Sequence, residues 1–508
     1  MSMSRADVCF VVPGIAAKAY QGLADVYSAV VPPTWALLLA SAVRARGWEP
    51  AILDFEAQPA GTEAAAEQIG ALRPKLAVFV MYGQNPNSGT TSMIGAGELA
   101  SQLRRSHPEI KIGFIGSHVS ALPLEIVQLP YVDIAFLNEG VHALLALLES
   151  DFDGLDRVPG IWYKDRHGAP RSGAPGGIVS SAQMDALMPG YAWDLLPKRS
   201  VALDLYRAHF WHTNFLHEER TPFAAIYTSL GCQFGCNFCM INIVNRTSYE
   251  ADSTAADSRG MRFWSPGLIL GEFEKLWDMG VRTLRISDEM FFLNRKYYVP
   301  ILEGLIDRGL KFNLWAYARV DSVRKDQLEL FKAAGVNWLC LGIEAGNQLV
   351  RVEIDKGRFQ QVDIRQVVND IKDAKINVLG NYIFGLPEDT TETMTETLDL
   401  ALELQCEHTN FYAAQALPGS PLYLYAKREG WDLPRRPEEY AFLSYECKPL
   451  RTKHLQAAEV LRFRDEAWHR YFSDPGYLGM IEQKFGIHAR TNIEDLAKIR
   501  LKRKLLGD

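Results

Sequence analysis

The sequence lacks any apolar run long enough to span a bilayer, and its first residues, Met1-Ser-Met-Ser-Arg-Ala, lack a signal-peptide core. Both absences predict a cytoplasmic protein without a membrane partner. Basic residues are also fewer than acidic ones. The sequence has 54 Lys and Arg and 61 Asp and Glu, which gives a formal net charge of -7. This balance argues against nucleic acid as the main partner. A chain of 508 residues exceeds one ordinary hydrophobic core, so two or three domains are expected.

Cysteine is scarce and odd in number, which excludes a disulfide framework as the organising feature. The seven cysteines are Cys9, Cys232, Cys236, Cys239, Cys340, Cys406 and Cys447. Three of them follow an apolar run with the spacing C-x3-C-x2-C, close enough for their thiolates to share one metal centre. Three protein ligands leave a coordination position open, which is typical of catalytic rather than structural sites. A fourth ligand from Cys406 or Cys447 stays a minor alternative.

Residues 6–150 alternate strand and helix patterns, with apolar runs at 8–12, 51–55, 76–80, 111–115 and 132–136. Five such units predict a doubly wound parallel sheet. Ligands of such sheets bind beyond the carboxyl ends of the strands, here the loops 82–92, 116–120 and 138–140. No G-x-G-x-x-G follows the first run, which argues against a nicotinamide or flavin site.

Residues 156–220 are expected to form a hairpin and linker, in which His209 and His212 face either the site or the surface. Six further strand and helix units follow, which predicts a partial barrel over 221–428. Its strands end at polar candidates for chemistry, which are the cysteine loop, Asp288 with Glu289, Arg319, Glu344, Glu388 and Gln415. Residues 429–508 are expected to be helical and to cap the barrel or close over a substrate. The basic segment 498–504 is typical of a solvated helix face.

The cysteine loop, with Phe238 before its last cysteine and its place after the first barrel strand, resembles the signature of the radical S-adenosylmethionine (SAM) enzymes. The resemblance implies a [4Fe-4S] cluster on Cys232, Cys236 and Cys239, with SAM at the open position as the source of a 5'-deoxyadenosyl radical. Ser287-Asp288-Glu289 stands where the family has a Gly-Gly-Glu turn, and Asn381 replaces the first glycine of its adenine motif. The implied SAM-binding residues are Phe238, Ser287, Asp288, Glu289, Arg319, Glu344, Ile383 and Gly385.

The domain order resembles the cobalamin-binding radical SAM subfamily, with a cobalamin-binding Rossmann-like domain over 1–155. The implied cobalamin-binding residues are Asn85, Ser88, Thr90, Thr91, Gly116, Ser117, His118, Val119, Glu139 and Gly140. The Asp-x-His-x-x-Gly motif of many cobalamin proteins is absent after the first strand, so no histidine from that motif is expected beneath the cobalt.

The resemblance implies an α/β enzyme that transfers a methyl group to an unactivated carbon of a small molecule. It also implies an electron donor such as flavodoxin or ferredoxin. The alternatives are a radical cyclase or rearrangement enzyme with the same cofactors and, from another class, a cluster- and cobalamin-binding sensor without turnover. The sequence identifies neither a catalytic acid or base nor the substrate.

Overall fold

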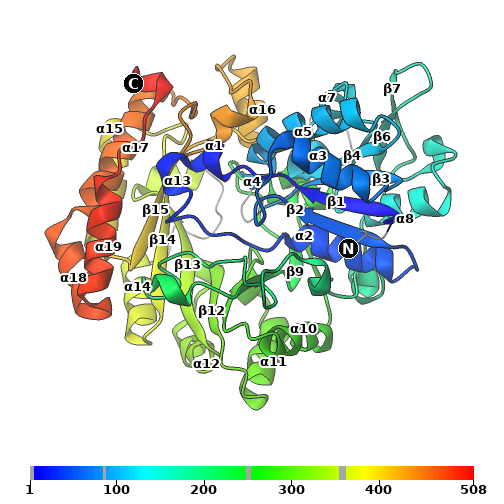
Figure 1. The fold of residues 1–508 in the computed structure, drawn as a ribbon. Helices are drawn as coiled ribbons and strands as arrows, with labels where there is room; N and C mark the ends of the chain where they lie inside the picture. Colours follow the sequence, from blue (N-terminus) through cyan, green and yellow to red (C-terminus); the bar gives the residue numbers. More distant parts are fainter. Residues whose placement is uncertain (1–4, 84–86, 247–252, 354–361) are drawn as a thin grey trace.

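The computed structural model of the protein describes residues 5–83, 87–246, 253–353 and 362–508. It contains a seven-stranded sheet near the N-terminus, a six-stranded parallel sheet in the middle and a C-terminal group of helices (Figure 1). In these four ranges no helix is both long and apolar enough to cross a bilayer. The predicted α/β architecture, with a parallel N-terminal sheet, a partial barrel and C-terminal helices, is confirmed.

The N-terminal sheet has the strand order β2-β1-β3-β4-β5-β6-β7. Its strands are β1 (Val8–Val12), β2 (Pro50–Asp54), β3 (Leu76–Met81), β4 (Lys111–Gly116), β5 (Ile134–Phe136), β6 (Ile161–Lys164) and β7 (Pro170–Ser172). The first five are parallel, whereas β6 and β7 join antiparallel at the edge. The hairpin expected in the linker therefore extends this sheet.

Helices cover both faces of the N-terminal sheet, which explains why its strands are continuous apolar runs. Val8 and Phe10 of β1 pack in one core, whereas Cys9 and Val11 pack in another. The helices are α2 (Thr34–Arg44), α3 (Thr62–Ala71), α5 (Met93–Ser106), α7 (Pro123–Gln128) and α8 (Val141–Glu149), with the short α1 (Ala16–Tyr20), α4 (Ser88–Thr91) and α6 (Ser117–Ala121) at the strand ends.

The central sheet has the order β15-β14-β13-β12-β11-β8, and all of its pairs are parallel. Its strands are β8 (Phe223–Ile226), β11 (Thr283–Ile286), β12 (Asn313–Arg319), β13 (Val336–Glu344), β14 (Asn377–Phe384) and β15 (His408–Ala413). Helices follow the strands, namely α10 (Pro266–Asp278), α11 (Arg295–Asp307), α12 (Leu328–Ala333), α13 (Gln348–Glu353), α14 (Ile364–Asp373), α15 (Thr391–Leu404) and α16 (Pro421–Arg428). A separate antiparallel hairpin joins β9 (Ser229–Cys232) to β10 (Gly260–Phe263).

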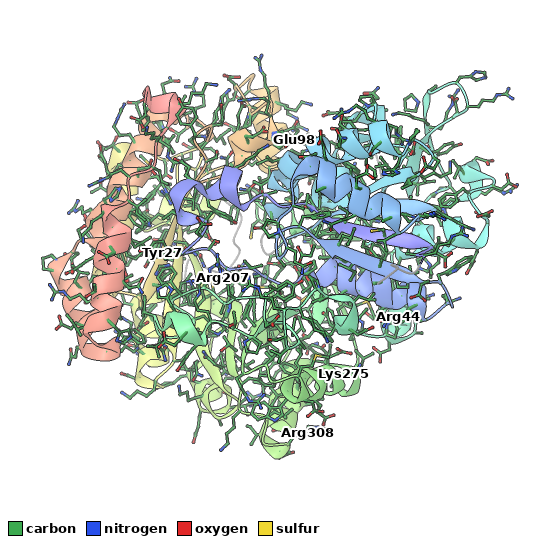
Figure 2. The ribbon with its side chains drawn as sticks, viewed as in Figure 1. Tyr27, Arg44, Glu98, Arg207, Lys275 and Arg308 are labelled. Atoms are coloured by element: carbon green, nitrogen blue, oxygen red, sulfur yellow. The ribbon has the colours of Figure 1, made fainter. Side chains whose placement is uncertain are left out.

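Residues 173–222 contact both the N-terminal domain and the barrel. Tyr206 donates a hydrogen bond of 2.9 Å to Asp54 at the end of β2, and Trp193 donates one of 2.9 Å to Glu272 on α10. Arg207 donates to the carbonyl oxygens of Ala24 and Ser28, which holds the segment of Tyr27 against the linker (Figure 2). The two sheets are therefore fixed relative to each other by buried polar contacts.

The C-terminal helices α17 (Ala457–Phe472), α18 (Pro475–Phe485) and α19 (Ile487–Lys498) pack beside the β15 edge of the barrel (Figure 1). Tyr471 donates to the carbonyl oxygen of Cys406, and Arg464 donates to that of Phe411, at 2.8 Å each. Residues 499–503 then run without helix or strand.

Candidate functional site: a cysteine hairpin facing an interdomain cavity

The cysteine loop begins at the end of β9 and is held by side-chain amides. Asn242 accepts a hydrogen bond of 2.7 Å from the Cys232 backbone and donates one of 2.9 Å to the Phe234 carbonyl. Gly231 has a φ of 87°, and a Cβ there would lie 2.3 Å from the Gly260 carbonyl oxygen. Only glycine fits this backbone beside β10.

The three thiols lie close enough to influence one another electrostatically. Burial, with smaller contributions from Glu289 and Cys236, raises the pKa of Cys232 to about 12. Burial also raises the pKa of Cys239, with smaller contributions from Cys236 and Cys232. Loading a metal must therefore displace the protons of these thiols.

The donor set fits an iron–sulfur cluster better than a single ion. Within the described ranges, no three ligand side chains converge closely enough to hold one metal ion. A cluster spreads its thiolates over different irons, so it needs no such convergence. Cys406 and Cys447, the alternative fourth ligands, are buried beside Tyr382 and Gln415 respectively. The hairpin thus offers three thiols, and their role as cluster ligands stays a prediction.

Arg319, predicted to bind SAM, supports the cysteine loop. Its guanidinium stacks over the Phe234 ring at 3.7 Å and lies 4.0 Å from Cys236 Sγ. It also forms two 2.8 Å hydrogen bonds with Asp321. The residue thus places a positive charge beside a cluster thiol, while its role toward SAM stays a prediction.

Asp288 and Glu289 follow β11 but face different surroundings. The Asp288 carboxyl accepts from the Thr228 amide and hydroxyl at 2.6 Å each and from the Ser229 hydroxyl, which fastens β9 to the end of β11. Burial raises the pKa of Asp288 to about 6 and that of Glu289 to about 7, where Arg285 opposes the rise. Ser287 donates its amide to Ile226 at 2.7 Å.

The ends of β13 and β14 bring together the other predicted SAM residues. Phe238 of the cysteine loop and Ile383 of β14 pack in one small apolar cluster with Ala345, Leu386 and Ala414. Glu344 has a φ of 65° at an irregularity of the β13–β14 pairing, a costly conformation for a residue with a Cβ. Gly385 has a φ of 85°, and its amide donates a hydrogen bond of 2.9 Å to the Asp389 carboxylate.

The residues predicted for cobalamin gather at the carboxyl end of the N-terminal sheet. Thr90 on α4 contacts His118 on α6, with 3.1 Å between Oγ1 and Nδ1. Burial lowers the pKa of His118 to about 4, so its imidazole is neutral near pH 7. A Cβ at Gly116 would lie 2.2 Å from the Met81 carbonyl oxygen, so β4 ends tightly against β3. Asn85 lies outside the described residues.

Glu139, also predicted for cobalamin, joins the two domains. Its carboxylate forms a buried ion pair with Arg262 on β10, with 3.0 Å between Oε1 and Nη1. The side chain of the neighbouring Asn138 donates a hydrogen bond of 2.7 Å to the Arg246 carbonyl oxygen. The cysteine hairpin is therefore docked on the β5–α8 loop, which carries Gly140.

A cavity of about 550 Å³ lies between the N-terminal sheet and the barrel. Among the predicted residues, Ser88, Thr91 and Ser287 line it, while Ser117 and Glu289 line a small adjoining space of about 30 Å³. The strand ends of both sheets thus meet at one place. The smaller space also touches Gly231 of the cysteine loop, so the cavity and the thiols are neighbours.

Sequence reasoning missed most of the inner wall of this cavity. His209, one of the two uncertain histidines, lines the cavity, whereas His212 is buried in the core and contacts the Asn313 carbonyl. The missed wall residues are Trp211, Arg285, Trp315, Tyr317, Cys340 and His408. The available signal was the two-residue period of a strand, since Arg285 on β11 stands two residues before Ser287, which directly follows the strand.

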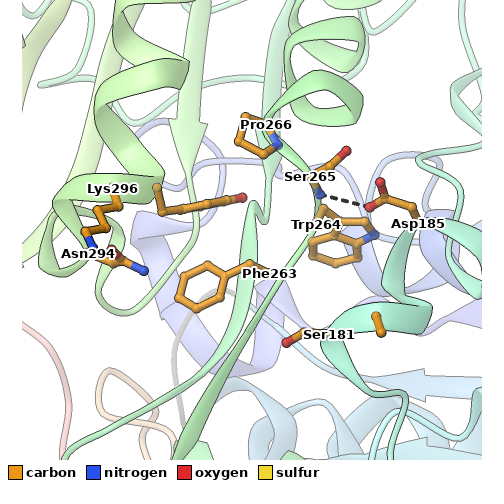
Figure 3. A pocket seen from close by; sticks show the side chains of 10 residues that line it. Ser181, Asp185, Phe263, Trp264, Ser265, Pro266, Asn294 and Lys296 are labelled. Carbon is orange, nitrogen blue, oxygen red and sulfur yellow. Dashed lines mark hydrogen bonds between the residues drawn. The ribbon is translucent and has the colours of Figure 1, made fainter.

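A second groove lies outside the barrel, between the linker and the starts of α10 and α11 (Figure 3). Asp185 accepts a hydrogen bond of 2.9 Å from the Ser265 amide there. None of the predicted site residues lines this groove. The groove is therefore separate from the predicted site.

Comparison with known proteins gives two family models that match the chain in the expected order. The model of the B12 binding domain matches residues 20–148, and that of the radical SAM superfamily matches residues 226–401. The chain is 24% identical over 396 residues to an uncharacterized methyltransferase of Pyrococcus horikoshii. The matched region covers 77% of this chain and 78% of the relative.

Two further proteins share most of the chain. The anaerobic magnesium-protoporphyrin IX monomethyl ester cyclase of Cereibacter sphaeroides is 24% identical over 77% of this chain, which spans 60% of that relative. The solved structure of the radical SAM methyltransferase TsrM from Kitasatospora setae, with cobalamin and a [4Fe-4S] cluster bound, superposes with a TM-score of 0.67. The superposition covers 98% of this chain and 99% of TsrM at 16% identity and shows a shared fold. The protein is a member of the radical SAM superfamily with an N-terminal B12 binding domain.

Proposed function

We propose that this protein is a cobalamin-dependent radical SAM methyltransferase that modifies an unactivated carbon of a small molecule. The observation that carries the proposal is the convergence of the cysteine hairpin and the strand ends of the N-terminal sheet on one cavity. The uncharacterized methyltransferase of Pyrococcus horikoshii and the fold shared with TsrM support the same reaction class.

Each set of residues has a distinct task in this proposal. When bound, the cluster with SAM supplies a carbon radical and cobalamin supplies a transferable methyl group. Cys232, Cys236 and Cys239 would hold the cluster, and Glu289 and Glu344 would bind SAM. The neutral His118 and its partner Thr90 belong to the cobalamin side. The buried ring side chains of the cavity exclude water, which protects a radical from side reactions.

An electron must reach the cluster before SAM can be cleaved. We infer a flavodoxin or ferredoxin as its donor, because the chain itself offers no second cysteine cluster among the residues described. Reduction assays with either protein in place of dithionite test this partner.

The reaction is tested by anaerobic incubation of cluster- and cobalamin-loaded protein with methyl-labelled SAM and candidate substrates. Methyl transfer predicts label in the product together with both S-adenosylhomocysteine and 5'-deoxyadenosine. Formation of 5'-deoxyadenosine with an unlabelled product would sink the proposal.

The cluster ligands are tested separately with Cys236→Ala. The variant should lose most of its iron and all SAM cleavage, because a thiolate ligand is removed. Cys9→Ala is the matched control, since Cys9 is a buried cysteine in β1 of the other sheet. Full iron content in the Cys236 variant would contradict the assignment.

A radical cyclase is the second candidate. The cyclase of Cereibacter sphaeroides matches 77% of this chain, about as much as the methyltransferase does. The same incubation separates the two, because a cyclase would release 5'-deoxyadenosine without consuming the methyl group.

A further inference from the structure

Residues 209–212 of the linker lie across the amino ends of the barrel strands. Nε2 of His212 lies 3.1 Å from the carbonyl oxygen of Asn313, the first residue of β12. The ring of Trp211 stacks on that of His408, the first residue of β15, with 6.0 Å between the centroids. Residues 209–212 therefore form a floor at the amino ends of the strands, opposite to the carboxyl ends where the predicted chemistry lies.

The interdomain cavity reaches from this floor to the carboxyl ends of the strands. His209 and Trp211 line it at the floor, and Ser287, which directly follows β11, lines it at the other end. Glu289 stands two residues further on and lines the small adjoining space together with Gly231 of the cysteine loop. A ligand inside the barrel would therefore have the floor on one side and the cysteine hairpin on the other.

Ring side chains line the cavity next to the floor. The rings of His209 and Trp211 are nearly parallel, at an angle of 11° and with 5.4 Å between the centroids. The Trp315 ring of β12 stands edge-on to both, 6.5 Å from His209 and 5.4 Å from Trp211. All three residues line the cavity. Ring surfaces of this kind suit a planar apolar ligand.

His209 brings a polar group into this wall of rings. Its side chain is half-buried, and within the described ranges neither ring nitrogen has a hydrogen-bond partner. Neither nitrogen is fully buried, so both can be reached from the cavity. His212 of the same floor differs, because its Nε2 contacts the Asn313 carbonyl. A neutral imidazole offers one hydrogen-bond acceptor and one donor, so His209 can bind a polar group of a ligand.

The charges next to the floor favour a neutral partner for this imidazole. Burial lowers the pKa of His209, with smaller contributions from Arg285, Arg220, His408 and His212. The imidazole is therefore neutral near pH 7 and attracts no anion by charge. The buried Arg285 already acts on a carboxyl group of the protein, since it lowers the pKa of Glu289. A hydroxyl or N–H group without charge is thus the better match for His209.

Two further polar atoms next to the floor lack a partner. Nε1 of Trp315 and Nδ1 of His408 are buried, and neither forms a hydrogen bond in the part of the chain that the structure describes. Both residues line the cavity. Buried polar atoms of folded proteins are normally paired, so this end of the cavity has more polar groups than the protein itself satisfies. Such a surplus points to a ligand with a hydrogen-bonding group.

We propose that His209 forms a hydrogen bond with a neutral hydroxyl or ring N–H group of the substrate, whose planar apolar frame packs against Trp211 and Trp315. The assignment rests on the proposed function only in taking the cavity ligand to be the substrate. It narrows the substrate class to planar, largely apolar molecules that carry such a donor. His209 then selects for this group and turns it toward the floor, away from the cysteine hairpin.

The test measures the binding of 2-naphthol and its methyl ether, 2-methoxynaphthalene, to cluster- and cobalamin-loaded protein by anaerobic equilibrium dialysis. The two probes share one planar frame, but only 2-naphthol has a hydrogen to donate. The preference for 2-naphthol over the ether should fall about three- to tenfold in His209→Phe, the range of one hydrogen bond, because phenylalanine keeps the ring and loses both nitrogens. His209→Gln should restore part of the preference through its amide oxygen.

His469→Phe is the matched control, because His469 lines the same cavity but its Nδ1 lies 3.2 Å from the Ala497 carbonyl oxygen. This variant should keep the preference of the wild type. Iron content and SAM binding show that each variant is folded, and His209→Leu replaces the phenylalanine variant should that protein lose its iron.

An unchanged preference in the folded His209 variant would overturn the proposal, and so would an equal loss in His469→Phe. The labelled-methyl experiment fails independently of this one. A preference that depends on His209, with no methyl transfer, would leave the binding site standing and remove the proposed reaction. Methyl transfer with a preference that ignores His209 would do the reverse.

Discussion

At the residue scale, Glu289 is a carboxyl group whose charge changes near neutral pH. Burial and Asp288 raise its pKa, Arg285 lowers it, and the result is about 7. If Glu289 binds the SAM amino group as a carboxylate, SAM affinity should rise with pH through 7, because the protonated acid carries no charge to attract an ammonium. Glu289→Gln should bind SAM roughly tenfold more weakly at pH 8, the loss of one charged hydrogen bond.

The measurement is the dissociation constant of SAM from pH 6 to 8 for wild type and variant, and the difference between the two curves isolates Glu289 from the titration of SAM itself. Glu303→Gln, an exposed glutamate on α11, is the control and should follow the wild type. Parallel curves for Glu289→Gln and wild type would show that the carboxylate does not bind SAM.

At the element scale, the β9–β10 hairpin depends on the buried pair of Arg262 and Glu139. Their side chains are 7% and 2% exposed. Arg262→Met should destabilise the protein by about 3–5 kcal/mol, because it leaves the Glu139 charge buried without its partner. The double variant Arg262→Met with Glu139→Met should recover most of this loss, since no charge is then stranded.

The measurements are the midpoint of thermal unfolding and the iron content of each variant. Arg365→Met is the control, because the Arg365–Glu403 pair is 58% and 53% exposed and such pairs contribute about 0–1 kcal/mol. An Arg262 variant as stable as the Arg365 variant would mean that the hairpin is docked by other contacts.

The same hairpin shows where prediction from the sequence ends. The apolar runs identified the eleven principal strands of both sheets, because local periodicity carries that signal. The run 223–230, however, forms two strands, since Asp288 takes the Thr228 amide that would continue the first. The partner strand Gly260–Phe263 has no apolar alternation of its own, and its place depends on Glu139, far away in the sequence.

The residues of the cavity wall could not be predicted from the sequence for a related reason. Arg285 lies between Leu284 and Ile286 and has no motif around it. Its burial is made possible by Trp315 and Tyr317, which only the register of β11 and β12 brings beside it. The cysteine loop was predictable because its ligands lie within eight residues, whereas a wall assembled from five strands, β11 to β15, has no local signature.

At the scale of the whole molecule, the segment 498–504 is solvated at Lys498, Arg500, Lys502 and Lys504, as its charge suggested, but it is not a helix face. Helix α19 ends at Lys498, and Arg503 is fully buried, with hydrogen bonds to Asp465 and to the Phe442 and Ser444 carbonyls. Ile499, Leu501 and Leu506 line the cavity beside Tyr20 and Leu23 of the N-terminal segment. Segments far apart in the sequence therefore line the cavity together.

Gln21 is the bridge between these two segments. Its side chain donates to the carbonyls of Leu443 at 2.7 Å and Lys502 at 3.2 Å and accepts from the Lys502 amide at 3.2 Å. Gln21→Ala should raise deuterium uptake in residues 15–23 and 499–503 by about tenfold, because each lost hydrogen bond is worth about 0.5–1.5 kcal/mol. Uptake in β8 and β11 to β15 should not change. Gln68→Ala, on the exposed side of α3, is the control. Equal uptake in the two variants would show that the two segments line the cavity independently of each other. A rise of uptake only in residues 15–23 and 499–503 would identify Gln21 as the contact that couples the N-terminal segment to the C-terminal one.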